Sequence, residues 1–365
     1  MVLIAGIDFG SSLIKGFSGG KEFVTPSMVG EYNEGWSGMG NDSSWDNNLC
    51  LHVGIDESGE VYKQFFGELA RTQSEVKRVL TKGGMIANVT DVDTAVKTTL
   101  AVLALKTGEI QDSYEDVQEF DCIATIGVPV STMVPKMKEL SQQLKGVKEI
   151  VLENDHTKQI LQLRFNITNC MVVYGPYGSY YQMLREFNES TAVDAVVTDI
   201  GYGSAEILSI YEGRPNSLAS ASISDLSLET LANRIASALQ QQTGRILKGI
   251  ELMRVLQSDK STVIIGGETL DISELKTYYI EAIANSLTEE IQALVSQLPP
   301  DARIKYYIFT GDGVELFWKE LEMALYQKNL IADINQAAHP KDYRIENAKG
   351  FENIARAKYE KAKNS

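Results

Sequence analysis

The sequence predicts an α/β protein built from two halves of related topology. Its 365 residues suffice for two domains at roughly 150 residues each. Short apolar runs that suit strands alternate with amphipathic stretches that suit helices, which is the pattern of α/β folds. The run GIDFGSSLIKGF at 6–17 is echoed by VTDIGYGSAEILSI at 197–210. Both place an acid and a turn glycine between two apolar strands, so each half is expected to present one such hairpin.

The elements of the first half follow from hydrophobic periodicity. Strands are short apolar runs, the first helix has apolar residues at helical spacing, and the last segment alternates like a hairpin. In order, we expect strands at 2–8 and 13–17, a helix at 92–105, a buried strand at 122–130, a helix at 135–144 and a hairpin at 150–167.

The second half repeats the opening strand–turn–strand pattern and then becomes mainly helical. An amphipathic helix at 227–242 is ended by Gly244, and a long helix at 274–297 stops at Pro299. The other expected elements are a hairpin at 263–272, a strand at 304–310, a helix from 314 to 325 and a final helix at 347–363.

The composition limits the partners of the protein. The net charge of -15 and the pI of about 4.8 disfavour direct, sequence-independent binding of nucleic acid, which requires Lys and Arg to replace phosphate counterions. They also disfavour a general affinity for anionic membranes. Any DNA partner is therefore expected to be reached through another protein.

The N-terminus and the cysteines indicate the compartment. No basic leader and no long apolar stretch is present, so we expect a cytoplasmic protein with neither signal peptide nor transmembrane helix. Cys50, Cys122 and Cys170 are widely spaced and form no CxxC pair, which argues against a zinc site and a disulfide framework.

The two hairpins carry the residue types of phosphate loops. Glycine permits a tight turn and lets backbone N–H groups approach an anion without a Cβ in the way. Serine hydroxyls add donors, and a lysine places a point charge on a phosphate. The residues expected to cradle phosphates are Gly10, Ser11, Ser12, Lys15, Gly201, Gly203 and Ser204.

The acids of the two hairpins are candidates for catalysis through a metal. Carboxylates repel phosphate, but they can orient a Mg²⁺ through its waters, because this ion keeps much of its hydration shell. Asp8 and Asp199 are therefore expected to hold magnesium. Alone, either could be an ordinary acid in a hairpin turn, since the DxG pattern is short. The repetition of the DxG pattern in both halves favours a magnesium site.

A third glycine turn follows the strand at 304–310. Gly311, Asp312 and Gly313 lie between this strand and a helix N-terminus, a place that suits a ribose or an α-phosphate. On its own the turn is a weak signal. It gains meaning from its order after the two hairpins.

Together these motifs resemble the actin-like superfamily of actins, plasmid-segregation actins, sugar kinases and chaperone ATPases. DFGSSLIKG and TDIGYGSAEIL are similar to its two phosphate motifs, and YIFTGDGVEL to its adenosine motif. ATIGVPVS resembles the strand before the first interdomain connection, and VVYGPYGSYYQML and ENAKGFENIA resemble the two connecting helices. The resemblance implies an actin-like fold with a nucleotide cleft between two domains, at 1–170 plus 347–365 and at 171–346.

Within the superfamily, the opening DFGSSLIKGF with TPSMVG and the ending NAKGFENIARA resemble plasmid-segregation actins, the ParM group. This implies an ATPase that polymerises into filaments and moves plasmid DNA through an adaptor protein at a centromere-like site. The implied cofactors are ATP or ADP with Mg²⁺, and use of GTP is open. The family also places Asn233, Arg234 and Ser237 at the purine and ribose, whereas the alternative is a solvated helix face.

One departure concerns hydrolysis of the γ-phosphate. Many relatives begin the first connecting helix with Glu-Pro or Gln-Pro, and that side chain positions the attacking water. Here Gly175 precedes Pro176, so another group, Gln182 or Asp8, is expected to orient the water. Water positioning matters because phosphoryl transfer depends mainly on placement and charge neutralisation.

Two rival functions share the fold. A small-molecule kinase of the sugar type needs a carboxylate base, but Pro129, Val130 and Ser131 follow the strand at 122–130, and the Cys-rich zinc motif of many small sugar kinases is absent. A chaperone-type ATPase needs a following substrate-binding domain, for which we expect no room.

The tail at 341–365 has seven Lys/Arg against four Asp/Glu, which fits either a charged helix face or a contact to a neighbouring subunit.

Overall fold

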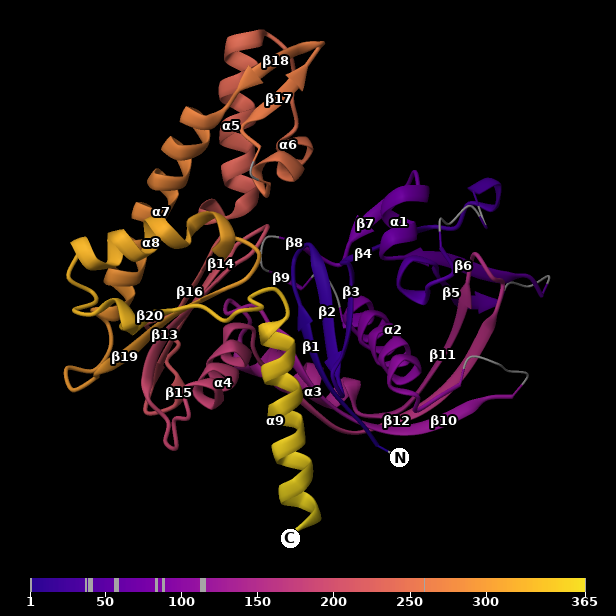
Figure 1. The fold of residues 1–365 in the computed structure, drawn as a ribbon. Helices are drawn as coiled ribbons and strands as arrows, with labels where there is room; N and C mark the ends of the chain where they lie inside the picture. The colour runs from indigo at the N-terminus through magenta and orange to yellow at the C-terminus, as the bar shows by residue number, and fades with distance from the viewer. Residues whose placement is uncertain are drawn as a thin grey trace. The chain divides into compact units, whose positions relative to one another are not determined.

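Two units make up the chain in the computed structural model (Figure 1). The structure describes residues 2–36, 38, 42–55, 59–82, 85–86, 89–111, 116–258 and 260–364. Unit 1 comprises Met1–Gln182 and Asn347–Ser365, and unit 2 comprises Met183–Glu346. The division drawn from the sequence puts the first boundary earlier, after residue 170, and stays a prediction.

Unit 1 is organised around a ten-stranded mixed sheet. Neighbouring strands run antiparallel except β1, β10 and β12, which are mutually parallel. In sheet order the strands are β3 (Lys21–Pro26), β2 (Leu13–Ser18), β1 (Val2–Phe9), β10 (Gln118–Val128), β12 (Ile160–Tyr174), β11 (Gly146–Asn154), β5 (Leu49–Ile55), β6 (Val61–Phe66), β4 (Met28–Glu31) and β7 (Lys77–Val79). A separate short ribbon pairs β8 (Thr81–Lys82) with β9 (Met85–Ile86).

Helices cover this sheet and form its core. Leu100 of α2 and Leu140 of α3 are fully buried against strand residues such as Phe165. The helices are α1 (Glu68–Gln73), α2 (Val89–Thr107), α3 (Val134–Leu144), α4 (Pro176–Glu186), which belongs to this unit up to Gln182, and α9 (Glu346–Lys363), which belongs to it from Asn347. The helices expected at 92–105, 135–144 and 347–363 are confirmed, as is the hairpin at 150–167, which is β11–β12.

A hairpin separates the predicted strand at 122–130 from α4. That strand is β10, and the strand that leads directly into α4 is β12. The β11–β12 hairpin intervenes in the sequence, and β12 then runs parallel beside β10. Gly175 still touches the end of β10, because its N–H donates to Val128 O at 2.7 Å.

Unit 2 has a smaller sheet that repeats the core of unit 1. Its strands are β15 (Arg214–Pro215), β14 (Ala205–Tyr211), β13 (Asp194–Ile200), β19 (Ile304–Thr310) and β20 (Ala337–Ala338), with β16 (Ala221–Ile223) also on β14. β13 lies between antiparallel β14 and parallel β19, as β1 lies between antiparallel β2 and parallel β10. The internal echo is therefore an equivalence of strand topology.

The helices of unit 2 begin and end where the sequence signals them. The Ser227 side chain accepts a hydrogen bond from Thr230 N at the start of α5, and Gly244 ends this helix in the left-handed conformation that glycine tolerates. The helices are α5 (Leu228–Thr243), α6 (Gly249–Leu256), α7 (Ser273–Val295) and α8 (Val314–Gln327), and β17 (Thr262–Ile265) pairs with β18 (Glu268–Asp271). No helix in the described ranges is both long and apolar enough to cross a membrane.

The last helix packs directly on the sheet of unit 1. A Cβ on Gly6 of β1 would lie 2.0 Å from Ala348 O, and one on Gly350 would lie 1.9 Å from Gly178 O of α4. Only glycine allows backbones to approach so closely. Phe351 is fully buried at this junction, so its side chain serves packing.

Candidate functional site

The first hairpin places Asp8 and Lys15 face to face. They are direct partners in the β1–β2 register, and Lys15 is 92% buried, with only 8% of its surface exposed. The turn between them closes through Gly10 N, which donates to Leu13 O at 3.1 Å. Across such a pair the two side chains share one face of the sheet, so the lysine charge is held next to the aspartate.

Neighbouring segments of unit 1 fix this loop. The Thr81 hydroxyl donates to Gly10 O at 2.9 Å, and Ser27 N donates to Ser12 O at 2.8 Å. Ser11 and Ser12 are half-buried at the turn. The loop is thus anchored through two of its carbonyl groups, which is the pre-organisation that an anion-binding turn needs.

The second hairpin has the same turn. Gly201 N donates to Ser204 O at 2.9 Å, in the way that Gly10 N reaches Leu13 O. Its carbonyls accept from the start of α5, where Leu228 N reaches Gly201 O at 3.2 Å and Glu229 N reaches Tyr202 O at 2.8 Å. The loop is therefore joined to the N-terminal turn of α5, the positive end of the helix dipole.

The residue opposite the aspartate has the opposite charge in the two hairpins. Asp199 lies opposite Glu206 in the β13–β14 register, where Asp8 lies opposite Lys15. Glu206 is buried, and its Oε1 accepts from Ser204 Oγ at 2.8 Å and from Ser222 Oγ at 2.6 Å. Glu206 was not among the residues predicted from the sequence, although aligning the two echoed motifs residue by residue sets it at the position of Lys15.

The turn at Gly311 packs against the acid of the second hairpin. Gly311 has φ +88°, and a Cβ there would lie 2.1 Å from Asp199 Oδ1. Gly313 N donates to Ile200 O at 2.8 Å. Asp312, half-buried between them, completes the turn. Two of the three predicted motifs are thus brought together within unit 2.

The predicted purine-binding side chains line a separate cavity. Asn233, Arg234 and Ser237 are exposed on α5 and border a cavity of about 310 Å³ together with Tyr279 of α7. Its described lining includes no residue of 199–204 or 311–313. A role of these three residues at the purine and ribose stays a prediction.

The predicted water-orienting residue is held by the last helix. Asn353 Nδ2 of α9 donates to Gln182 Oε1 at 2.6 Å. One turn earlier on α4, Ser179 donates through both N (3.1 Å) and Oγ (2.6 Å) to Asn347 Oδ1. Gln182 therefore takes part in the joint between α4 and α9, and its role in catalysis stays a prediction.

The two predicted magnesium-binding acids belong to different units. Asp8 lies near the end of β1 in unit 1, and Asp199 near the end of β13 in unit 2. Within the described residues, His, Cys, Asp and Glu side chains form no group of three that could hold a metal ion. The role of Asp8 and Asp199 in holding magnesium stays a prediction.

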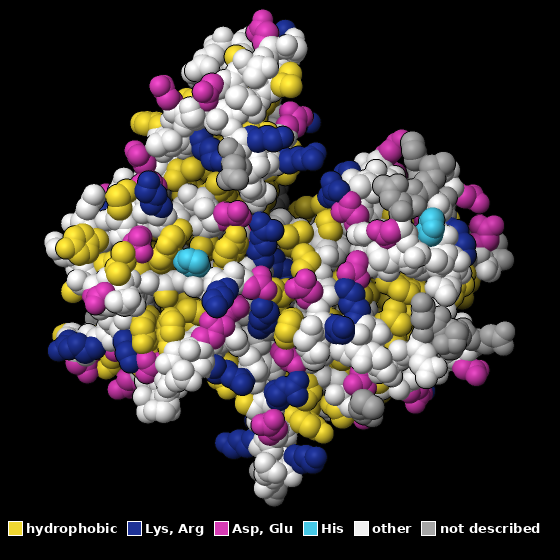
Figure 2. Space-filling view, viewed as in Figure 1, with side chains coloured by type: hydrophobic (Ala, Val, Ile, Leu, Met, Phe, Trp, Pro, Cys, Tyr) yellow, Lys and Arg dark blue, Asp and Glu magenta, His cyan; other side chains and the backbone are white. Residues whose placement is uncertain are grey.

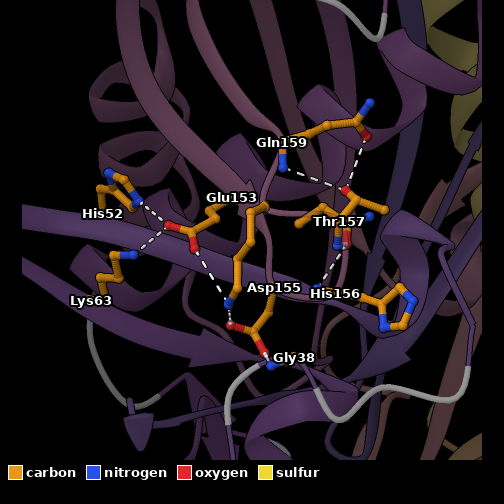
Figure 3. A network of polar contacts seen from close by, with 10 residues as sticks. Gly38, His52, Lys63, Glu153, Asp155, His156, Thr157 and Gln159 are labelled. Atoms are coloured by element: carbon orange, nitrogen blue, oxygen red, sulfur yellow. Dashed lines mark hydrogen bonds and ion pairs between the residues drawn. The ribbon is translucent and has the colours of Figure 1, made fainter.

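A second polar network lies on β5, β6 and the β11–β12 hairpin of unit 1 (Figure 3). Glu153 accepts from His52 Nε2 at 2.8 Å and from Lys63 Nζ at 2.5 Å. Burial alone would raise the pKa of Glu153, but these hydrogen bonds and the Lys63 charge outweigh it and lower the pKa to about 2. Asp155, close by, accepts from Gly38 N at 2.7 Å and pairs with Lys158. The network ties three strands together and is structural.

No family model and no curated protein matches this chain, but solved structures do. An archaeal actin homologue superposes with a TM-score of 0.72 at 18% identity, over 97% of this chain and 99% of its own. ParM in a 15-stranded filament from Clostridium botulinum gives 0.70 at 15%, over 98% and 99%. Bacillus thuringiensis ParM with AMPPNP gives 0.69 at 14%, over 98% and 99%.

These likenesses extend over nearly the whole chain and show that it has the actin-like fold. The fold class and the resemblance drawn from the motifs are confirmed at that level. The archaeal homologue was also solved in complex with ADP.

Proposed function

We propose that this protein is a nucleotide-dependent, polymerising ATPase. The observation that carries the proposal is the duplication of one phosphate-loop hairpin, with a strand-ending aspartate in each copy and a third glycine turn packed on Asp199. In the actin-like fold, these are the elements expected to receive a nucleotide.

The predicted site residues have three roles: binding phosphate, holding magnesium and receiving the ribose or the α-phosphate. Backbone N–H groups of the two loops, the hydroxyls of Ser11, Ser12 and Ser204, and the Lys15 ammonium bind phosphate oxygens. Asp8 and Asp199 hold Mg²⁺ through its waters, and the ion neutralises charge on the phosphates. The turn from Gly311 to Gly313 receives the ribose or the α-phosphate.

Glu206 is our candidate for orienting the attacking water. It lies opposite Asp199, and two serine hydroxyls donate to its Oε1 and fix the carboxylate beside the turn of the second hairpin. Gln182, the earlier candidate, already accepts from Asn353. A carboxylate held in this way can accept the proton of the water as it attacks the γ-phosphate.

Assembly and DNA segregation complete the proposal. The likeness to ParM in a filament supports self-association, and the ParM-type opening and ending motifs support plasmid segregation. The net charge of -15 means that contact with DNA would require an adaptor protein on a centromere-like site. ATP would favour the filament-competent form, and hydrolysis would weaken contacts between subunits in the cytoplasm.

The test combines sedimentation, light scattering and phosphate release at micromolar protein with Mg-ATP, Mg-ADP or no nucleotide. We expect pelletable filaments with Mg-ATP and release of phosphate. Asp199→Asn should abolish turnover, because the magnesium-orienting charge is lost. Asp301→Asn, which removes an exposed carboxylate paired with Tyr211 in the same unit, should leave turnover unchanged.

Absence of assembly across salt and crowding conditions, together with phosphate transfer to an added sugar, would instead identify a small-molecule kinase. Equal turnover of Asp199→Asn and the wild-type protein would show that the second hairpin is not the nucleotide site.

A further inference from the structure

The end of the β5–β6 hairpin exposes apolar side chains on both of its faces. Ile55 pairs with Val61 and Gly54 pairs with Tyr62, so these side chains alternate between the two faces of the ribbon. Ile55 is 72% exposed, Tyr62 61%, Val53 54% and Val61 41%. At the other end of the same strands, Leu51, Phe65 and Phe66 are fully buried. We call Val53, Ile55, Glu60, Val61 and Tyr62 the hairpin surface.

Such a concentration of apolar side chains points to a partner. Single exposed hydrophobic residues are common, whereas clusters at the end of a projecting ribbon mark sites of protein interaction. Val, Ile and Tyr favour strands because they pack on a neighbouring surface. Here that surface is missing within the described part of unit 1, since these four side chains remain 41–72% exposed.

The charge next to the hairpin surface is acidic. Glu60 is exposed beside Val61, and the charge of Lys63, the residue after Tyr62, is paired with Glu153. A complementary partner would therefore present basic side chains beside small or apolar ones.

The end of α9 is one described surface that meets this description. The last two turns of α9 carry four Lys/Arg against one Glu in residues 356–364, and all of these residues except Tyr359 are exposed. In Figure 2, dark blue side chains gather along this helix. Cations in the last turn also complement the helix dipole, and Arg356 pairs with Glu352 four residues earlier, but neither effect accounts for Lys358. We call Arg356, Lys358, Lys361 and Lys363 the basic helix end.

We propose that the hairpin surface of one copy docks against the basic helix end of a second copy. The two surfaces lie on different elements, so the contact is heterologous. A heterologous contact either closes a ring or extends into a filament, and a filament is what the proposed function requires. The inference rests on that proposed function, which it supplies with a named subunit contact.

Charge complementarity also explains how acidic copies can associate. Each chain carries a net charge of -15, so copies repel one another through their overall field. A local basic surface that meets an acidic one offsets this repulsion at the contact and selects its orientation. The apolar side chains of the hairpin then supply the area removed from water.

The first experiment compares two matched pairs of substitutions by sedimentation with Mg-ATP. Ile55→Ser with Tyr62→Ser should raise the critical concentration at least tenfold. The control is Ile264→Ser with Tyr278→Ser, which removes an isoleucine 76% exposed on the β17–β18 hairpin and a tyrosine 64% exposed on α7, and it should leave assembly unchanged. All four residues are exposed, so circular dichroism and phosphate release at low protein concentration should match the wild-type protein in both variants.

The second experiment exchanges charge between the two surfaces. Glu60→Lys alone and Lys358→Glu alone should each raise the critical concentration about fivefold. A chain that carries both changes should regain a critical concentration near that of the wild-type protein. An equimolar mixture of the two single variants should assemble better than either variant alone, since the mixture offers one matched contact.

The outcomes separate the two proposals. If the wild-type protein forms filaments but Ile55→Ser with Tyr62→Ser assembles equally well, the docking contact is overturned and the polymerising function stands. If the effects of Glu60→Lys and Lys358→Glu on the critical concentration combine in the double variant without any recovery, the pairing of the hairpin with α9 is overturned. A wild-type protein that never assembles would overturn both proposals.

Discussion

Lys15 and Glu206 occupy the same position of two equivalent hairpins, and each lies directly opposite the aspartate that ends the preceding strand. In the first hairpin an acid faces a base, and in the second an acid faces an acid. The duplicated hairpin therefore places a positive side chain opposite Asp8 and a negative side chain opposite Asp199. We infer that the first hairpin mainly binds phosphate and that the second mainly serves the metal and the water.

Substitutions at these two positions should have different effects. Lys15→Gln removes a charge-assisted contact worth about 1.5–3 kcal/mol, so the affinity for ATP should fall roughly tenfold to a hundredfold. Glu206→Gln keeps the acceptor for both serines, so affinity should hold while turnover falls at least tenfold. Calorimetric titration and single-turnover phosphate release measure the two quantities. Lys21→Gln, an exposed lysine in unit 1, is the control, and parallel losses of affinity and turnover in both variants would contradict this division.

Gly311 should tolerate no side chain, for a reason beyond its backbone conformation. Gly311 has φ +88° and Gly267 has φ +89°, so alanine costs about 1 kcal/mol of strain at either position. A Cβ on Gly267 meets nothing within 4 Å, whereas one on Gly311 lies 2.1 Å from Asp199 Oδ1. Gly311→Ala should therefore displace Asp199 and abolish turnover, while Gly267→Ala should keep it. Phosphate release and thermal unfolding distinguish the two, and normal turnover in Gly311→Ala would refute the role given to this contact.

Much of the fold could be predicted from the sequence because its signals are local. Apolar runs gave the strands of the two hairpins, and Ser227, Gly244 and Pro299 marked helix ends through capping and the missing N–H of proline. The order of the strands in the sheet was not predicted, because strand order depends on pairing between distant segments. Nothing local in the run at 122–130 reveals that β12 returns beside it.

The candidate site was predictable in its motifs but not in its contacts. Asp8, Asp199 and the glycine turns stand out as patterns, whereas Glu206 emerges only from the register that sets it opposite Asp199. Gln182 was a reasonable candidate by position on the connecting helix. Its hydrogen bond to Asn353 joins residues 171 positions apart, which a single sequence does not reveal.

Glu153 should make stability depend on acid pH. Its pKa in the folded protein is about 2, against an ordinary value of 4.5. Because the folded pKa is depressed, its contribution is complete above about pH 5 and is lost as the pH falls through 4.5 toward 2. The shift corresponds to about 3 kcal/mol at neutral pH. Between pH 7 and pH 3.5 the wild-type protein should lose roughly 1 kcal/mol more than Glu153→Gln.

Urea unfolding at the two pH values, monitored by circular dichroism, measures this difference. The control is Glu289→Gln, which removes a carboxylate that is 65% exposed and pairs with Lys328, and surface pairs of this kind contribute little. Identical pH profiles for Glu153→Gln and the wild-type protein would mean that His52 and Lys63 do not hold the carboxylate ionised.

Gly175 is the place where a single side chain could speed hydrolysis. Its backbone N–H donates to Val128 O and would be kept, and a Cβ there meets only Val128 O, at an ordinary 3.6 Å. The residue precedes Pro176 at the start of α4, where a carboxylate is favoured by the helix dipole. Gly175→Glu should therefore fold normally and raise single-turnover phosphate release about tenfold, if the water lacks a second acceptor. Gly175→Ala adds the Cβ without the acceptor and should leave the rate unchanged. A rate that rises equally in both variants would point to backbone stiffening instead, and no change in either would mean that Glu206 already orients the water sufficiently.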